Sequence, residues 1–186
     1  MTHVARIARL HPQDLDDDQR AVYDAIAGGR RAQGPQLFAL TDSDGGLEGP
    51  FNAFLLQPRL GGALQAVGSA IRYDTALTDR AREVAILVVA VRWSSAFEWQ
   101  AHEAVGRHVG LSQQELDGIR SGEYAALPAD ERALAEAAAR LAGDGDLDDA
   151  AYAQLVDLVG EAGVFELTTL VGYYATLALQ LRVFRV

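Results

Sequence analysis

The stretch EVAILVVAVRWSSAFEWQAH, residues 83–102, decides the fold of this chain. It begins with an unbroken apolar run at residues 84–91, a pattern that fits either a buried strand or a buried helix. We predict a helix, because alanine and leucine are interspersed with the β-branched residues, Thr78 offers a hydroxyl for an N-cap, and no partner strand is evident elsewhere. A second helix is predicted at residues 95–108, joined to the first by a tight turn at Ser94 and Ser95.

Helical signals also dominate the rest of the sequence. The segment SQQE at residues 112–115 is a capping-box pattern, in which serine and glutamate side chains satisfy backbone N–H groups where a helix begins. We therefore expect an all-α fold, with an N-terminal helical extension and loop at residues 1–49 and a helical domain at residues 50–186. Other helices are predicted at residues 15–27, 51–57, from residue 59 onward, and at residues 129–142, 147–160 and 164–184.

The composition limits the classes of function. The 186 residues include 26 acidic and 16 basic side chains, a formal net charge of −10, whereas nucleic acids and anionic membranes select basic surfaces. We expect no membrane span, because no apolar run approaches about 18 residues. We expect no signal peptide either, because the first residues lack a continuous apolar segment. These features predict a cytoplasmic protein.

Three side chains with acid–base chemistry flank or follow the apolar run, namely Glu83, Glu98 and His102. Glu98 and His102 are four residues apart, so they share one face of a helix. The predicted turn brings the helix of Glu83 alongside. A carboxylate against the imidazole would fix its tautomer, and a second carboxylate in an apolar pocket could stay protonated near neutral pH. The pattern indicates a proton-transfer site.

The spacing of these residues resembles a known family. Glu83, a gap of eleven residues, and then Ser95-x-x-Glu98-x-x-x-His102 is similar to the carboxymuconolactone decarboxylase / alkylhydroperoxidase D-like family, whose peroxidase branch carries Glu-x11-Cys-x-x-Cys-x-x-x-His. The blocks GPFNAFLLQPRL, GLSQQELDGIRSG and LVGYYATLALQLRVF agree with it, so the resemblance runs from Pro50 to the C-terminus. It implies an all-α, alkylhydroperoxidase D-like helical bundle whose subunits associate as homo-trimers or homo-hexamers.

The chain departs from the peroxidase branch at its redox centre. It has no cysteine, and Ser95 and Glu98 stand at the two cysteine positions. Neither side chain can cycle through a disulfide, which excludes a thiol peroxidase. The resemblance then implies a cofactor-free lyase of the lactone-decarboxylase type, without a metal, acting by proton transfer on a small carboxylated lactone or enolisable acid. The expected catalytic residues are Glu83, Glu98 and His102, and the expected substrate contacts are Ser95, Trp99 and Arg92.

Other interpretations are open from the sequence. Glu83 could pair with Arg80 or Arg92, and Glu98 with His102 could be an ordinary solvated pair. A metal site made of the three residues is a weaker interpretation, because the paired Glu-x-x-His motifs of di-iron bundles are absent. The chain could also be a non-catalytic oligomeric ligand-binding or scaffold protein that lost the peroxidase cysteines.

The C-terminal segment at residues 164–184 predicts association between subunits. It is apolar nearly all round, which is typical of a helix in a core or in an interface. Its stripe of Leu167, Leu170, Tyr174 and Leu177 would form a large exposed patch on a soluble monomer. We therefore expect a homo-oligomer with this helix partly in the interface.

Overall fold

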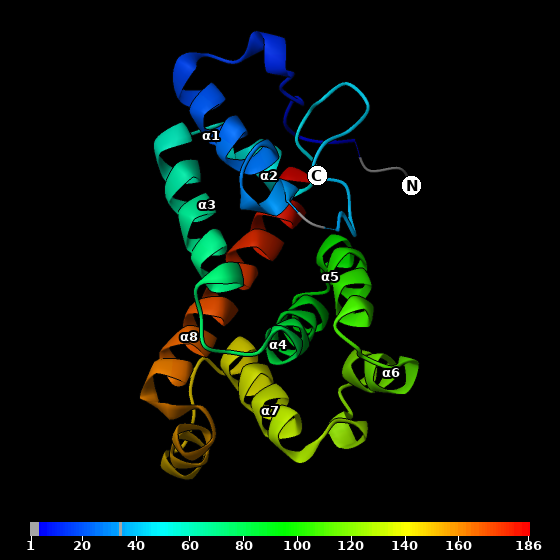
Figure 1. The fold of residues 1–186 in the computed structure, drawn as a ribbon, viewed down its shortest axis with the longest axis vertical. Coiled ribbons are helices and arrows are strands. Elements are labelled where there is room, and N and C mark those ends of the chain that lie inside the picture. The colour runs from blue at the N-terminus through cyan, green and yellow to red at the C-terminus, as the bar shows by residue number, and fades with distance from the viewer. Residues whose placement is uncertain (1–3, 34) are drawn as a thin grey trace. The chain divides into compact units, whose positions relative to one another are not determined.

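The computed structural model describes residues 4–33 and 35–186, and its regular structure is helical (Figure 1). Within these residues, β pairing is limited to one isolated bridge between Thr41 and Leu47. The predicted all-α fold is confirmed. None of the helices in the two described segments has the length and apolar character needed to span a membrane.

The chain forms two compact units, Met1–Tyr73 with Leu179–Val186, and Asp74–Ala178. In the first unit α3 packs against both α1 and α2, so residues on either side of the predicted boundary at residues 49 and 50 share contacts. The division into an extension at residues 1–49 and a domain at residues 50–186 stays a prediction. The helices of the first unit are α1 (Asp17–Ala27), α2 (Pro50–Phe54) and α3 (Pro58–Tyr73).

The second unit is built around α4 (Asp79–Arg92). Three helices pack against it, α5 (Ala96–His108), α6 (Gln113–Ser121) and α7 (Ala129–Gly143) (Figure 1). Nine consecutive residues of α4 are buried, from Arg82 to Ala90. A helix covered on all sides needs no polar face, which explains the unbroken apolar run in its sequence.

Side-chain caps fix where α4 and α6 begin, and a tight turn fixes the start of α5. The Thr78 hydroxyl accepts the Ala81 N–H at 3.1 Å, and Ser112 forms the predicted capping box with Glu115. Between α4 and α5 the chain turns at Ser94, whose φ is 52°, and the Ser95 N–H donates to the Ala90 carbonyl at 2.8 Å. This tight turn lays α5 against α4.

The last helix, α8 (Asp149–Phe184), is interrupted at Gly160, where φ is 71° and ψ is 169°. The interruption lies where the sequence predicts one helix to end before another begins at residue 164. Leu167, Leu170, Tyr174 and Leu177 are 0%, 0%, 5% and 5% exposed. The expectation that this stripe would be exposed on a single chain is wrong, because the chain buries it in its own core. The exposed stripe therefore no longer supports a homo-trimer or homo-hexamer.

Replacing Gly160 by alanine should destabilise the second unit by roughly 1–3 kcal/mol, because this combination of φ and ψ is strained for a residue with a Cβ. The matched control is Gly172→Ala in the same helix, where the added methyl group would meet no atom within 4 Å. That control should be neutral or stabilising by up to about 1 kcal/mol. Urea unfolding of both variants measures the difference, and equal unfolding free energies would contradict the strain at Gly160.

Candidate functional site

Glu83 and His102 form a buried pair in the second unit. The Nδ1 atom of His102 lies 2.7 Å from a carboxylate oxygen of Glu83, within hydrogen-bond distance. Glu83 is 1% exposed and His102 is 5% exposed, so the contact is shielded from water. The contact predicted from the sequence spacing is present. Arg80, one alternative partner for Glu83, instead binds Glu115 and Glu131.

The packing of α4 and α5 creates this pair. Because α4 is central to its unit, a carboxylate at Glu83 is removed from water and needs a hydrogen-bond partner inside the protein. His102 supplies that partner from the middle of α5, which packs against α4. An imidazole held at Nδ1 by a carboxylate has a fixed orientation and exchanges protons through Nε2. The pair can therefore serve as a general acid or base.

Glu98 lies one helical turn before His102 on α5 and is 2% exposed. Apart from the Ser95 hydroxyl, no group among the described residues is a hydrogen-bond partner of its carboxyl oxygens. Burial raises the pKa of Glu98 from 4.5 to about 8, although the neighbouring Ser95 hydroxyl lowers the pKa in part. The carboxyl is thus protonated at neutral pH and can donate a hydrogen bond.

Tyr174 of α8 also reaches this site. Its ring meets the His102 ring edge-on, with centroids 5.1 Å apart, and Tyr173 packs edge-on against it at 5.4 Å. The sequence analysis placed Tyr174 in an apolar stripe and not at the site, because an aromatic residue in a long apolar helix is usually a core or interface residue. The block LVGYYATLALQLRVF, part of the family resemblance, was the one signal that could have indicated it.

Two predicted substrate contacts have other neighbours in the structure. The Trp99 indole N–H donates to Glu103 at 2.9 Å, and the Arg120 guanidinium lies 4.3 Å from the centre of the Trp99 ring. Arg92 is exposed, and its guanidinium lies against Gly143 of α7. Their roles in substrate binding stay predictions.

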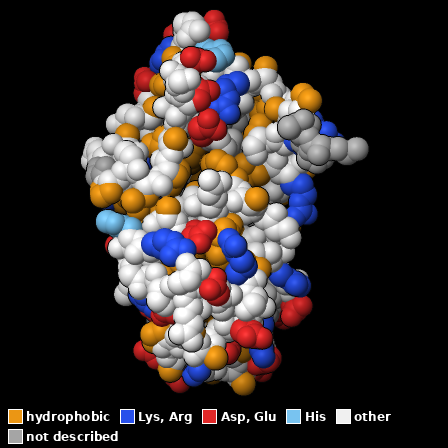
Figure 2. Space-filling model, turned by 90° about the vertical axis from the view of Figure 1, so that its right-hand side faces the viewer, with side chains coloured by type: hydrophobic (Ala, Val, Ile, Leu, Met, Phe, Trp, Pro, Cys, Tyr) orange, Lys and Arg blue, Asp and Glu red, His pale blue; other side chains and the backbone are white. Residues whose placement is uncertain are grey.

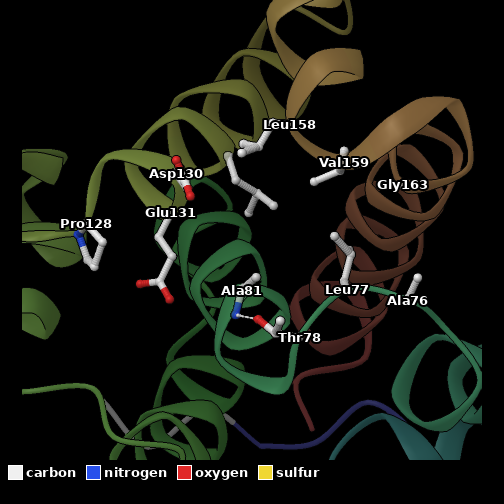
Figure 3. A pocket seen from close by; sticks show the side chains of 11 residues that line it. Ala76, Leu77, Thr78, Ala81, Pro128, Asp130, Glu131, Leu158, Val159 and Gly163 are labelled. Carbon is white, nitrogen blue, oxygen red and sulfur yellow. Dashed lines mark hydrogen bonds between the residues drawn. The ribbon is translucent and has the colours of Figure 1, made fainter.

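A cavity of about 480 Å³ lies elsewhere in the second unit (Figure 3). Its walls are mostly apolar, and Figure 3 shows Leu158 and Val159 of α8 on one side of it, with Glu131 of α7 among its polar groups. Glu131 already accepts hydrogen bonds from Arg80, at 2.8 and 3.0 Å. Glu83, Glu98 and His102 do not line this cavity, so it is separate from the Glu83–His102 pair.

Surface charge and metal-ligand geometry give no competing site on the described part of the chain. On the face drawn in Figure 2, acidic and basic side chains lie interspersed. No group of three or more His, Asp or Glu residues with an arrangement suited to a metal ion was found among residues 4–33 and 35–186. The buried residues around Glu83 and His102 are therefore the candidate site.

Comparison with known proteins identifies the family. Residues 58–142, a segment that contains Glu83, Glu98 and His102, match the model of the carboxymuconolactone decarboxylase family. The recognition made from the sequence is confirmed. Comparison with curated proteins gave no significant match.

Two solved structures share the fold. One is a protein of unknown function from Agrobacterium tumefaciens, for which the antioxidant defence protein AhpD has been suggested; it has a TM-score of 0.62 and 22% identity, over 74% of this chain and 96% of that chain. The other is the debrominase Bmp8, a cysteine-to-alanine variant in complex with 2,3,4-tribromopyrrole, with a TM-score of 0.73 and 10% identity, over 98% of this chain and 92% of that chain. These similarities confirm the alkylhydroperoxidase D-like helical fold.

Proposed function

We propose that the chain is a cofactor-free lyase of the decarboxylase type, which acts by proton transfer on a small carboxylated lactone or enolisable acid. The observation that carries this proposal is the buried Glu83–His102 contact of 2.7 Å, which orients an imidazole away from water. The family segment at residues 58–142 contains both residues. The debrominase complex supports a small planar ring as ligand, because that protein binds a tribromopyrrole on a similar fold.

In the proposed reaction, the bond between the substrate carbon and its carboxylate breaks. CO2 leaves, and the bonding electrons stay on the substrate as an enolate, which requires stabilisation of negative charge. His102 then donates a proton to carbon through Nε2, while Glu83 holds Nδ1–H. Water returns the proton to His102 after the product leaves. Glu98 serves as a second proton carrier or as a substrate contact.

The test is a turnover assay on a panel of small carboxylated lactones and β-keto acids, with released CO2 as the readout. The parent chain should turn over at least one member of the panel. The variant His102→Gln keeps a hydrogen-bond donor toward Glu83 but cannot act as an acid, so kcat should fall by about 100-fold or more. Turnover that is unchanged in folded His102→Gln, or absent from the parent chain with every compound, would refute the proposal.

The second candidate function is a non-catalytic, ligand-binding helical protein. One observation favours it: the cavity of about 480 Å³ is lined by residues other than the acid–base set. In that case Glu83 and His102 form a structural pair, and the panel compounds should raise the melting temperature without any release of CO2. A cytoplasmic homo-trimer or homo-hexamer is our proposal for either function.

A further inference from the structure

Helix α5 begins without a side-chain cap, in contrast to its neighbours α4 and α6. Thr78 and Ser112 each accept a backbone N–H from the first turn of α4 and α6. Ser95 is the N-cap of α5, yet its hydroxyl accepts no such bond. The first intrahelical bond runs from the Trp99 N–H to the Ser95 carbonyl at 3.0 Å. The N–H groups of residues 96–98 are therefore the orphan donors of this helix start, next to the positive end of the helix dipole.

Three buried side-chain oxygens lie at the same place. The Ser95 hydroxyl and both carboxyl oxygens of Glu98 are buried, and apart from the interaction of Ser95 with Glu98 they have no hydrogen-bond partner among the described residues. Ser95 is 9% exposed and Glu98 is 2% exposed. Buried polar groups in native proteins nearly always have partners, because an unpaired group loses its hydration without compensation. A buried cluster of oxygens without partners outside the cluster, at an uncapped helix start, indicates a ligand.

We propose that the first turn of α5 is an oxyanion-binding site, in which the Ser95 hydroxyl, the Glu98 carboxyl and the orphan N–H groups hold the charged oxygen of a small planar enolate. His102 lies one helical turn beyond Glu98 on the same face of α5. A small ring whose oxygen is held at the helix start would therefore place its carbon near His102, the proposed acid. This inference rests on the proposed function, because the enolate oxygen belongs to the substrate that His102 protonates.

The protonation state of Glu98 decides whether the site accepts an anion. Burial raises its pKa to about 8, so at neutral pH the carboxyl donates a hydrogen bond and carries no charge that would repel an enolate. Above that pKa the carboxylate repels the ligand. The titratable side chains buried on the elements around it are Arg82 and Glu83 on α4, His102 on α5, and Tyr173 and Tyr174 on α8.

The test uses 2,4-dinitrophenolate, a coloured planar anion that stays ionised between about pH 6 and about pH 10. Its dissociation constant is measured by absorbance titration of the parent chain and of the variants Ser95→Ala, Glu98→Gln and His102→Gln. Because the site is buried, side chains must move before the probe enters, so binding should be slower than diffusion.

The parent chain should bind the probe saturably, and its affinity should fall tenfold per pH unit above about pH 8. Glu98→Gln keeps a donor and has no proton to lose, so it should bind at neutral pH without that fall. Ser95→Ala should bind about fivefold more weakly. The matched control, Ser112→Ala, removes a serine N-cap from α6 and should leave binding unchanged.

The outcomes separate this inference from the proposed function. Saturable binding in His102→Gln, together with the pH dependence of Glu98, supports the oxyanion site whether or not the chain releases CO2. No saturable binding by the parent chain would overturn the inference even where turnover depends on His102. The same fall above about pH 8 in Glu98→Gln would overturn it as well, because another group would then control binding.

Discussion

Replacing Glu98 by glutamine should make the chain more stable than the parent at alkaline pH, by roughly 3–5 kcal/mol. The carboxyl has a pKa of about 8 in the folded protein, because it is buried, and 4.5 as its ordinary value. Below the lower pKa both states hold the proton, so the titration changes nothing. Between the two values the folded state keeps a proton that the unfolded state releases, and the parent loses about 1.4 kcal/mol per pH unit.

Above a pH of about 8, both states of the parent are ionised, and the full cost of burying the charge is present. Glutamine has a similar shape and does not titrate, so the difference between variant and parent should grow between these pKa values and then level off. Urea unfolding at a series of pH values measures it. The control is Glu161→Gln on the exposed surface of α8, where the carboxylate stays hydrated and no such growth is expected. Parallel pH profiles for the parent and Glu98→Gln would contradict the raised pKa of the buried carboxyl.

The helices could be predicted from the sequence because their signals are local. The cap at Thr78, the capping box at Ser112 and the turn after α4 each depend on residues within one turn of each other. The Glu83–His102 contact is not local, and it was predicted from the spacing that the family resemblance supplied. Physical chemistry then explains the contact, because a carboxylate in a covered helix needs a partner.

Features that depend on tertiary packing could not be predicted from local sequence patterns. Tyr174 lies far along the chain from His102, and nothing in its neighbourhood distinguishes a residue against the site from a residue of the core. Trp99 shares α5 with the acid–base residues, but its ring faces Glu103 and Arg120. Glu98 fitted a solvated pair as well as a buried acid, since four-residue spacing gives a shared face and says nothing about what covers it.

The same reasoning explains why the oligomer argument failed. Apolar residues at helical spacing show that a stripe is covered, but the covering group can belong to the same chain or to another one. In this fold the stripe of α8 is covered within the chain, and Leu167 and Leu170 are fully buried. A second copy therefore has to be argued from other surfaces.

Replacing His102 by alanine should destabilise the chain by roughly 2–4 kcal/mol, because Glu83 then stays buried without the partner that holds it at 2.7 Å. The substitution also removes the edge-on contact with Tyr174. His102→Gln keeps a donor and part of the volume, so its cost should be about 1 kcal/mol. Urea unfolding at neutral pH compares the two variants.

A double-mutant cycle isolates the interaction between the two side chains from these packing effects. Glu83→Gln, His102→Gln and the double variant should give a coupling free energy of about 1–3 kcal/mol, because the pair is buried and polarised in a medium of low dielectric constant. The matched control is the exposed pair of Glu103 and Arg107, four residues apart on α5 at 3.0 Å, where the coupling should stay below about 0.5 kcal/mol. Equal coupling in the two cycles would mean that Glu83 and His102 interact no more strongly than a solvated pair, and the oriented imidazole on which the proposed chemistry depends would then lack its energetic support.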